Sequence, residues 1–203
     1  MGWSIDGRLP EDPELAEKLF TTLGRALFVA ASFERKCAFV LQVVTVSERA
    51  SNRDVTGMSF EDIFAPVNEG STLLGRTLHG LKSKDRLKDI LPVLHRGRVA
   101  RNHIAHDTVA ELGPLGTIGT KAIDRVISEL RLQLDALAQA DAEISRIVYW
   151  IDQEDEPLPV WLDRNYAARL VEWVLDGDAN RLREDRKEHE RDLWANVPAQ
   201  SKT

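Results

Sequence analysis

An arginine and two histidines stand together in the six-residue run Arg101-Asn102-His103-Ile104-Ala105-His106. An arginine fork can donate two hydrogen bonds to phosphate oxygens and can offset negative charge that develops on them. A histidine titrates near neutral pH, so it can take or give a proton during a reaction. An arginine followed five residues later by a histidine therefore predicts chemistry at a phosphate group, with Arg101 and His106 as the reacting pair.

The spacing of Arg101 and His106 limits how one helix could present them. At about 3.6 residues per turn, residues five apart differ by about 140° around a straight α-helix, so the two side chains do not share a face. Asn102 lies four residues before His106 and does share its face. A two-fold dimer would bring both copies of the pair to one cleft, and we therefore expect a homodimer. The alternative is structural: Arg101 pairs with an acidic residue and His106 caps a helix end.

Basic charge is concentrated just before and within this run, although the chain as a whole is acidic. The whole chain carries a net charge of −6, whereas residues 82–101 hold seven basic and two acidic residues, a net charge of +5. The distribution of charge matters more for binding a polyanion than the total does. Arg96 and Arg98 are therefore candidates for binding substrate phosphates.

Apolar residues recur every three or four positions through most of the chain, a spacing that is typical of helices. No alternation with a period of two predicts a strand, so we expect an all-α bundle of four main helices with short additional helices. The main helices are expected at residues 13–47, 87–105, 123–151 and 160–176, and the short ones at 59–64, 72–81 and 180–194. Pro92 predicts either a kink in the second main helix or a later start near Leu91, and Gly177 predicts the end of the fourth.

Two residues of the third main helix have more than one interpretation. Asp141 interrupts the apolar stripe of this helix, so it either meets an arginine from another helix or marks a place where the stripe is exposed. Trp150 could stack on a nucleic-acid base, but its spacing is that of a packed residue, and we expect it in the core.

The form R-N-x-x-x-H, late in a middle helix and followed by another long helix, resembles the motif of the HEPN superfamily. These are all-helical domains of many prokaryotic toxins and antiviral effectors, and the resemblance extends over about residues 13–152. It implies metal-independent RNA cleavage without a cofactor, in which the ribose 2′-OH attacks the adjacent phosphate. It also implies catalytic roles for Arg101, Asn102 and His106, a homodimer, and a toxin or phage-defence setting with an antitoxin or sensor protein as a further partner.

Four other residues are candidates for binding the RNA substrate. HEPN domains often turn a polar or acidic residue of the first helix toward the site, which implies that role for Glu34. The alternative is that Glu34 is a surface residue at the edge of the apolar stripe that contains Leu27. His103 lies outside the Arg–His pair and is expected only to line the site, together with Arg96 and Arg98.

Two further resemblances leave other functions open. Residues 73–78, followed by the Arg-Asn-x-x-Ala-His run, are similar to the mannitol operon repressor family, which implies a non-catalytic transcriptional regulator or partner-binding module. His79, His106-Asp107 and Asp124 resemble the spaced ligands of HD-type phosphohydrolases, in which carboxylates and imidazoles bind divalent metals that activate water. Against that interpretation, Thr108 follows Asp107 where those enzymes usually have an apolar residue and a glycine.

The sequence divides into an N-terminal segment at 1–12 that is expected to be flexible, a HEPN-like helical domain at 13–176, and a charged C-terminal helix and tail at 177–203. Cys37 is the single cysteine, which predicts a reducing compartment. The N-terminus lacks the basic and apolar regions of a signal peptide. The longest uncharged apolar-rich run has 11 residues, against about 20 needed to span a bilayer. We expect a cytoplasmic protein with no membrane partner.

Overall fold

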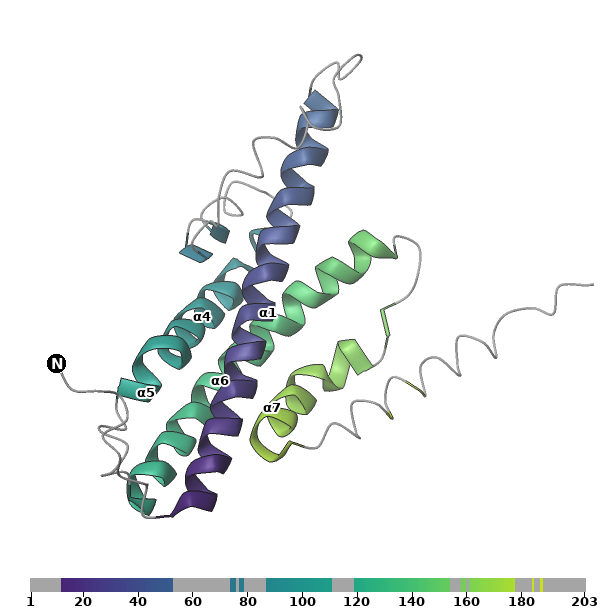
Figure 1. Ribbon diagram of the computed structural model, residues 1–203. Coiled ribbons are helices and arrows are strands. Elements are labelled where there is room, and N and C mark those ends of the chain that lie inside the picture. Colours follow the sequence, from purple (N-terminus) through teal and green to yellow (C-terminus); the bar gives the residue numbers. More distant parts are fainter. Residues whose placement is uncertain are drawn as a thin grey trace, which may run out of the picture.

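The computed structural model describes residues 12–52, 74–75, 77–78, 87–110, 119–153, 158–159, 161–177, 184 and 187. Within these residues the fold is all-α, as predicted. Its main helices are α1 (Pro13–Asn52), α4 (Leu91–Asn102), α6 (Thr120–Asp152) and α7 (Tyr166–Asp176) (Figure 1). Three short helical segments join them: η3 (His103–Asp107), α5 (Thr108–Ala110) and η5 (Trp161–Asn165). Each of the four main helices expected from the sequence is therefore present.

Several expected segments fall wholly or partly outside the described residues. The N-terminal segment up to residue 11 and the short helix at 59–64 lie outside them. Within the expected helix at 72–81, the four described residues are helical. Of the C-terminal segment the structure describes residues 177, 184 and 187, and the last two are helical.

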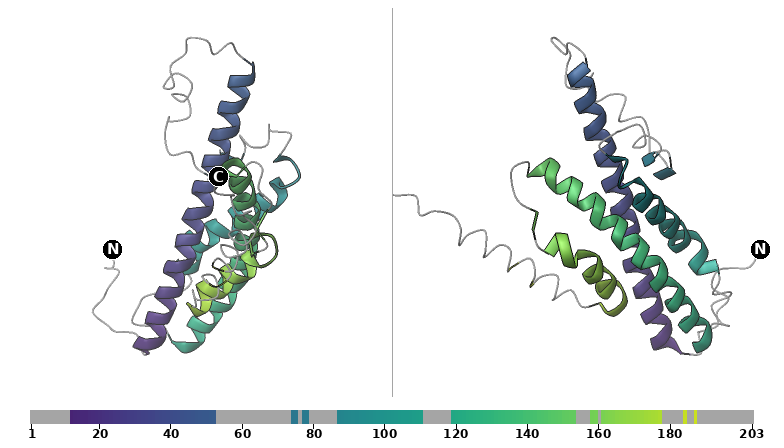
Figure 2. Two further views of the ribbon diagram at one scale, coloured as in Figure 1. Left: turned by 90° about the vertical axis from the view of Figure 1, so that its right-hand side faces the viewer. Right: turned by 180° about the vertical axis from the view of Figure 1, so that it is seen from behind.

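Helix α6 is the centre of the bundle, because it packs against α1, α4 and α7. Figure 1 shows α1 in front of the other helices, and the side view in Figure 2 shows it at one edge of the bundle. The apolar stripe of α6 supplies much of the core, and four of its side chains have at most 1% of their surface exposed: Leu130, Leu134, Leu137 and Ile144. The 4-3 spacing read from the sequence is therefore the buried face of this helix.

Local signals account for the start of α1 but not for its end. Asp12 caps the helix, since its Oδ1 accepts a hydrogen bond from the Leu15 amide at 3.0 Å. Pro13 occupies the first turn, where a missing N–H costs nothing. The predicted end near residue 47 is wrong, because the helix continues to Asn52. The sequence after residue 47 contains Glu, Arg and Ala, which are good helix formers, and no glycine or proline before Gly57.

Helix α4 begins at Leu91, which places Pro92 in its first turn and confirms the later start over the kink. Gly97 lies in the middle of α4 at the point where three helices meet. A methyl group there would overlap Cβ of Ala140 on α6 and would come within 3.1 Å of the Phe33 ring on α1. The absence of a side chain at this position sets how closely α4 approaches α6, and thereby where the end of α4 lies.

We expect the substitution Gly97→Ala to lower the free energy of unfolding by about 1–3 kcal/mol, the usual cost of overpacking a core. An unstrained helical glycine gains about 0.5–1 kcal/mol from the same change, so the sign of the effect separates the two situations. Gly24→Ala on α1 is the matched control, because no atom lies within 4 Å of the added methyl. Urea unfolding followed by circular dichroism measures both variants. A Gly97→Ala protein as stable as the wild type would show that α4 and α6 are not in close contact.

Asp141 is buried, with 1% exposure, and meets a lysine rather than the arginine or the exposed gap that the sequence allowed. Its Oδ2 accepts hydrogen bonds from Lys36 Nζ and from the Tyr166 hydroxyl, both at 2.7 Å. Lys36 also donates to Oγ of Ser145 at 2.9 Å. Burial raises the pKa of the Tyr166 hydroxyl, and the Asp141 carboxylate raises it further, so the hydroxyl remains a donor. This polar cluster links α1, α6 and α7.

Helix α7 ends where the sequence predicted. Gly177 has a φ of +75°, a left-handed conformation that favours glycine, and its amide donates to the Trp173 carbonyl at 2.9 Å. The start of α7 differs from the prediction, because the turn at η5 is a π-helix rather than the first turn of an α-helix. Trp150 is 52% exposed, so the prediction that it lies in the core is wrong. It lies near the end of α6, where the apolar face of α6 is only partly buried.

Among the described residues, no helix combines the length and apolar character that crossing a bilayer requires.

Candidate active site at the end of helix α4

Arg101 lies in the last turn of α4 and reaches across to α1. Its Nη2 donates to Oε2 of Glu34 at 2.6 Å, and its Nη1 donates to Oδ1 of Asn102 at 3.2 Å. The side chains of Arg101 and Glu34 are 24% and 29% exposed, so the pair is accessible to a ligand at the surface. Glu34 thus lies beside the Arg–His run, and its carboxylate holds the guanidinium in one orientation.

The turn that follows Arg101 is not α-helical. Residues His103–Asp107 form a π-helix, in which the Thr108 amide bonds to the His103 carbonyl five residues back. The Thr108 hydroxyl donates to the same carbonyl at 3.1 Å. Thr108 itself is buried, with 2% exposure, so this second bond is shielded from water.

The π-helical turn changes the relation between Arg101 and His106. A π-helix has more residues per turn than an α-helix, and π-turns within helices are frequent at functional sites. Residues five apart therefore come closer to one face than the 140° of a straight α-helix allows. The premise that one helix must separate Arg101 from His106 is wrong, and a dimer does not follow from helix geometry.

The two histidines of the run have different surroundings. His106 is exposed. His103 is 21% exposed and lies between two carboxylates, with Nδ1 3.5 Å from Asp107 Oδ2 and Nε2 3.7 Å from Glu129 Oε1. These distances are at or beyond the limit of a hydrogen bond, and within the described residues His103 Nε2 has no hydrogen-bond partner. Of the two, His106 is the side chain that a ligand in solution can reach.

The two candidate arginines of α4 differ in their position relative to Arg101. Arg98 is half-buried and lies three residues before Arg101, so the two share one side of the helix. Arg96 is exposed and lies five residues before Arg101, about 140° away around an α-helix. The structure therefore aligns Arg98 with the Arg101–Glu34 pair but turns Arg96 to another side.

The candidate ligands of a metal site are not gathered in the described part of the chain. No three His, Cys, Asp or Glu side chains there lie close enough to hold a metal ion. Asp107 and Asp124 are exposed, and His79, the remaining candidate, lies outside the described residues.

Glu129 is a residue that the sequence did not single out. It lies on α6 and reaches the ring of His103, so it belongs to the surroundings of the candidate site. Glu129 falls in the middle of a helix rich in charged residues, and nothing in its spacing distinguishes it from the other surface acids. Its position beside His103 depends on how α4 crosses α6.

The chain matches no model of a known protein family, and neither the curated proteins nor the solved structures give a significant match.

Proposed function

We propose that this protein is a metal-independent endoribonuclease of a toxin or phage-defence type, which cuts RNA with Arg101 and His106. The observation that carries the proposal is the arrangement at the end of α4. There Glu34 orients Arg101 at 2.6 Å, and a π-helical turn carries the exposed His106 round toward the same side. The resemblance of the R-N-x-x-x-H run to the HEPN motif supports the same chemistry. The toxin or defence setting rests on that resemblance alone.

In the proposed reaction the ribose 2′-oxygen attacks the adjacent phosphorus and the bond from phosphorus to the 5′-oxygen breaks. The products are a 2′,3′-cyclic phosphate and a 5′-hydroxyl. His106 transfers a proton at the 2′-hydroxyl or at the leaving 5′-oxygen. Arg101 has five N–H donors, of which one bonds to Glu34 and one to Asn102. The other three can bind the phosphate oxygens and offset their developing charge.

Asn102 and Arg98 extend the site around Arg101. Asn102 accepts a hydrogen bond from Arg101 and keeps its own NH₂ group for a phosphate or a base. Arg98 lies one turn before Arg101 and can bind the next phosphate of a single strand. Because one histidine cannot both remove a proton and donate one in the same step, His106 of a second copy can perform the other transfer. RNA, a second copy of the chain, and an antitoxin or sensor protein are the proposed partners, in the cytoplasm.

The alternative is a non-catalytic regulator or partner-binding module, as the likeness to the mannitol operon repressor family implies. One observation favours it: Glu34 already offsets the charge of Arg101, as it would in a structural ion pair. In this alternative the Arg101–Glu34 contact fixes α1 against the end of α4, and neither residue meets RNA.

A test of the reaction class is cleavage of RNA with and without a chelator. We expect cleavage to persist in excess EDTA and to leave 2′,3′-cyclic or 3′-phosphate ends, because the Arg–His mechanism contains no metal-bound water. End analysis by mass spectrometry identifies these products. Activity that disappears in EDTA and returns with manganese would instead support the HD-type phosphohydrolase. A protein that cuts none of the RNAs offered would support the regulator.

A further inference from the structure

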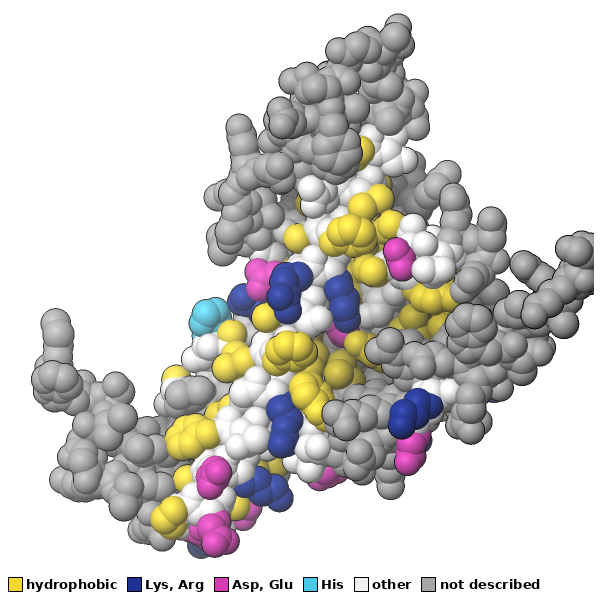
Figure 3. All heavy atoms as spheres, turned by 45° about the vertical axis from the view of Figure 1, so that its right-hand side comes forward, with side chains coloured by type: hydrophobic (Ala, Val, Ile, Leu, Met, Phe, Trp, Pro, Cys, Tyr) yellow, Lys and Arg dark blue, Asp and Glu magenta, His cyan; other side chains and the backbone are white. Residues whose placement is uncertain are grey.

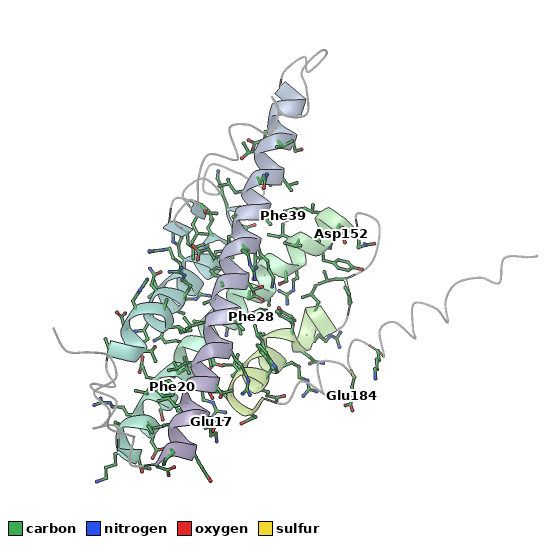
Figure 4. The ribbon with its side chains drawn as sticks, viewed as in Figure 1. Glu17, Phe20, Phe28, Phe39, Asp152 and Glu184 are labelled. Carbon is green, nitrogen blue, oxygen red and sulfur yellow. The ribbon has the colours of Figure 1, made fainter. Side chains whose placement is uncertain are left out.

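Helix α1 carries an apolar outer face that is free of contacts with the other described helices. Between residues 20 and 39 its exposed side chains include one charged residue, Arg35. The large apolar ones are Phe20, Leu27, Phe28 and Phe39, which are 44%, 42%, 61% and 43% exposed. Figure 4 labels the three phenylalanines along the helix, and Figure 3 shows hydrophobic side chains over its length.

The extent of this face is unusual for a surface that meets only water. A phenylalanine side chain can bury about 150–250 Å², so these four side chains together expose roughly 350 Å². A protein–protein interface of standard size buries about 800 Å² on each partner. Four side chains of α1 would therefore supply nearly half of one side of such an interface. Contiguous exposed apolar surface of this size is typical of contact sites.

The small residues on the same face determine how a partner helix could approach. Gly24, Ala31 and Ala38 are exposed and lie seven residues apart, so they form one line along α1. A methyl group at Gly24 would have no atom within 4 Å. A helix that crosses at this line can come close, while the phenylalanines and Leu27 pack along its sides.

The pattern is symmetric about Ala31, which points to a second copy as the partner. If two copies of α1 meet antiparallel about a two-fold axis at Ala31, Gly24 lies opposite Ala38 of the partner subunit. Arg35 then faces the partner's Leu27, and the two Arg35 positions are about 12 Å apart at 1.5 Å per residue. A parallel pair would instead place the two arginines against each other. The single charge on the face therefore favours the antiparallel arrangement.

We propose that this face of α1 joins two copies of the chain about a two-fold axis that passes close to Ala31. Glu34 lies one turn from Ala31 and holds Arg101, so the axis brings both candidate sites to the same side of the dimer. That consequence for the site rests on the proposed function, whereas the interface itself rests on the surface of α1 alone.

The first test is a cross-link at the axis. In the variant Ala31→Cys the two new thiols face each other, and we expect mild oxidation with copper phenanthroline to give a two-chain product on a non-reducing gel. Cys37 is fully buried, and burial raises the pKa of its thiol, so it stays unreactive. Leu132→Cys is the control, because Leu132 is 64% exposed on α6, away from this face.

The second test is the mass in solution, measured by light scattering at micromolar concentration without RNA. We expect two chains for the wild type and for Leu132→Glu, and one chain for Ala31→Arg, which adds bulk and charge at the axis. Circular dichroism confirms that Ala31→Arg is folded, which its exposed position predicts. A wild type of one chain, or an Ala31→Cys protein that cross-links no better than Leu132→Cys, overturns the proposal and leaves the face to a different partner. Because neither test uses RNA, a dimer that cuts no RNA would contradict the proposed function and leave the interface intact.

Discussion

Replacing Arg101 or His106 with alanine abolishes RNA cleavage and leaves the protein folded: this is the largest effect that we expect. Loss of a general acid or base lowers a rate by about 100- to 10,000-fold, and loss of a group that stabilises developing charge by about 100- to 1000-fold. His106 is exposed, so its removal changes stability by no more than about 0.5 kcal/mol. Arg101 pairs with Glu34 near the surface, where ion pairs contribute about 0–1 kcal/mol. Initial rates on a labelled RNA, together with thermal melting, measure the two effects separately.

The matched controls for this prediction come from the same run and from its partner on α1. His103→Ala should keep most of the activity, because His103 faces Asp107 and Glu129 rather than the Arg101–Glu34 pair. Arg101→Lys keeps the charge but loses the planar fork, so it should recover little activity. Glu34→Gln keeps an acceptor beside Arg101 without the charge, and we expect a partial loss. If the alanine variants of Arg101 and His106 both melt many degrees lower, the two residues are structural and the regulator becomes the better explanation.

The substitution Lys36→Met should have the largest effect on stability. It leaves the carboxylate of Asp141 buried at 1% exposure, with the Tyr166 hydroxyl as its remaining side-chain donor among the described residues. Removing one partner of a buried ion pair costs about 3–5 kcal/mol, because the other charge stays buried without compensation. For a chain of this size that loss corresponds to a fall in Tm of about 10 °C. Urea unfolding and thermal melting both measure it.

The double variant Lys36→Met with Asp141→Leu provides the control. Replacing both charges with apolar groups of similar volume is often close to neutral, because neither desolvated charge remains. We therefore expect the double variant to recover most of the stability that Lys36→Met loses, which is a large coupling energy in a double-mutant cycle. A Lys36→Met protein within about 1 kcal/mol of the wild type would mean that water reaches Asp141 in solution.

The positions of the helices follow from local features of the sequence. The 4-3 spacing of apolar residues in α6 predicted its buried face, because a helix can remove such a stripe from water only by packing it inward. Pro92 and Gly177 predicted a start and an end, because the first lacks an N–H and the second tolerates a positive φ. The end of α1 was missed for the opposite reason. No residue near position 47 opposes a helix strongly enough to terminate it.

The candidate site was predictable in part. The Arg101–His106 run is a local pattern, and Glu34 could be noticed as a charged residue in an apolar stripe. That Glu34 accepts a hydrogen bond from Arg101 is a contact between residues 67 positions apart. It depends on how α1 lies against the end of α4, which no local pattern specifies. The alignment of Arg98 but not Arg96 with Arg101, by contrast, follows from helix periodicity once the bounds of α4 are known.

By itself, the sequence determined an all-α bundle and the order of its main helices, because helix periodicity and helix ends are set by residues within a few positions of each other. Only the tertiary structure decided which polar groups meet. Lys36 and Asp141 are 105 residues apart and pair because α1 crosses α6 there. The π-helical turn at His103–Asp107 carried no signal in the sequence. It lies between the buried residues Ala100, Ile104 and Thr108 of one packed face, whose spacing of four would suit an α-helix equally well, so the backbone in this turn is decided by packing rather than by local preference.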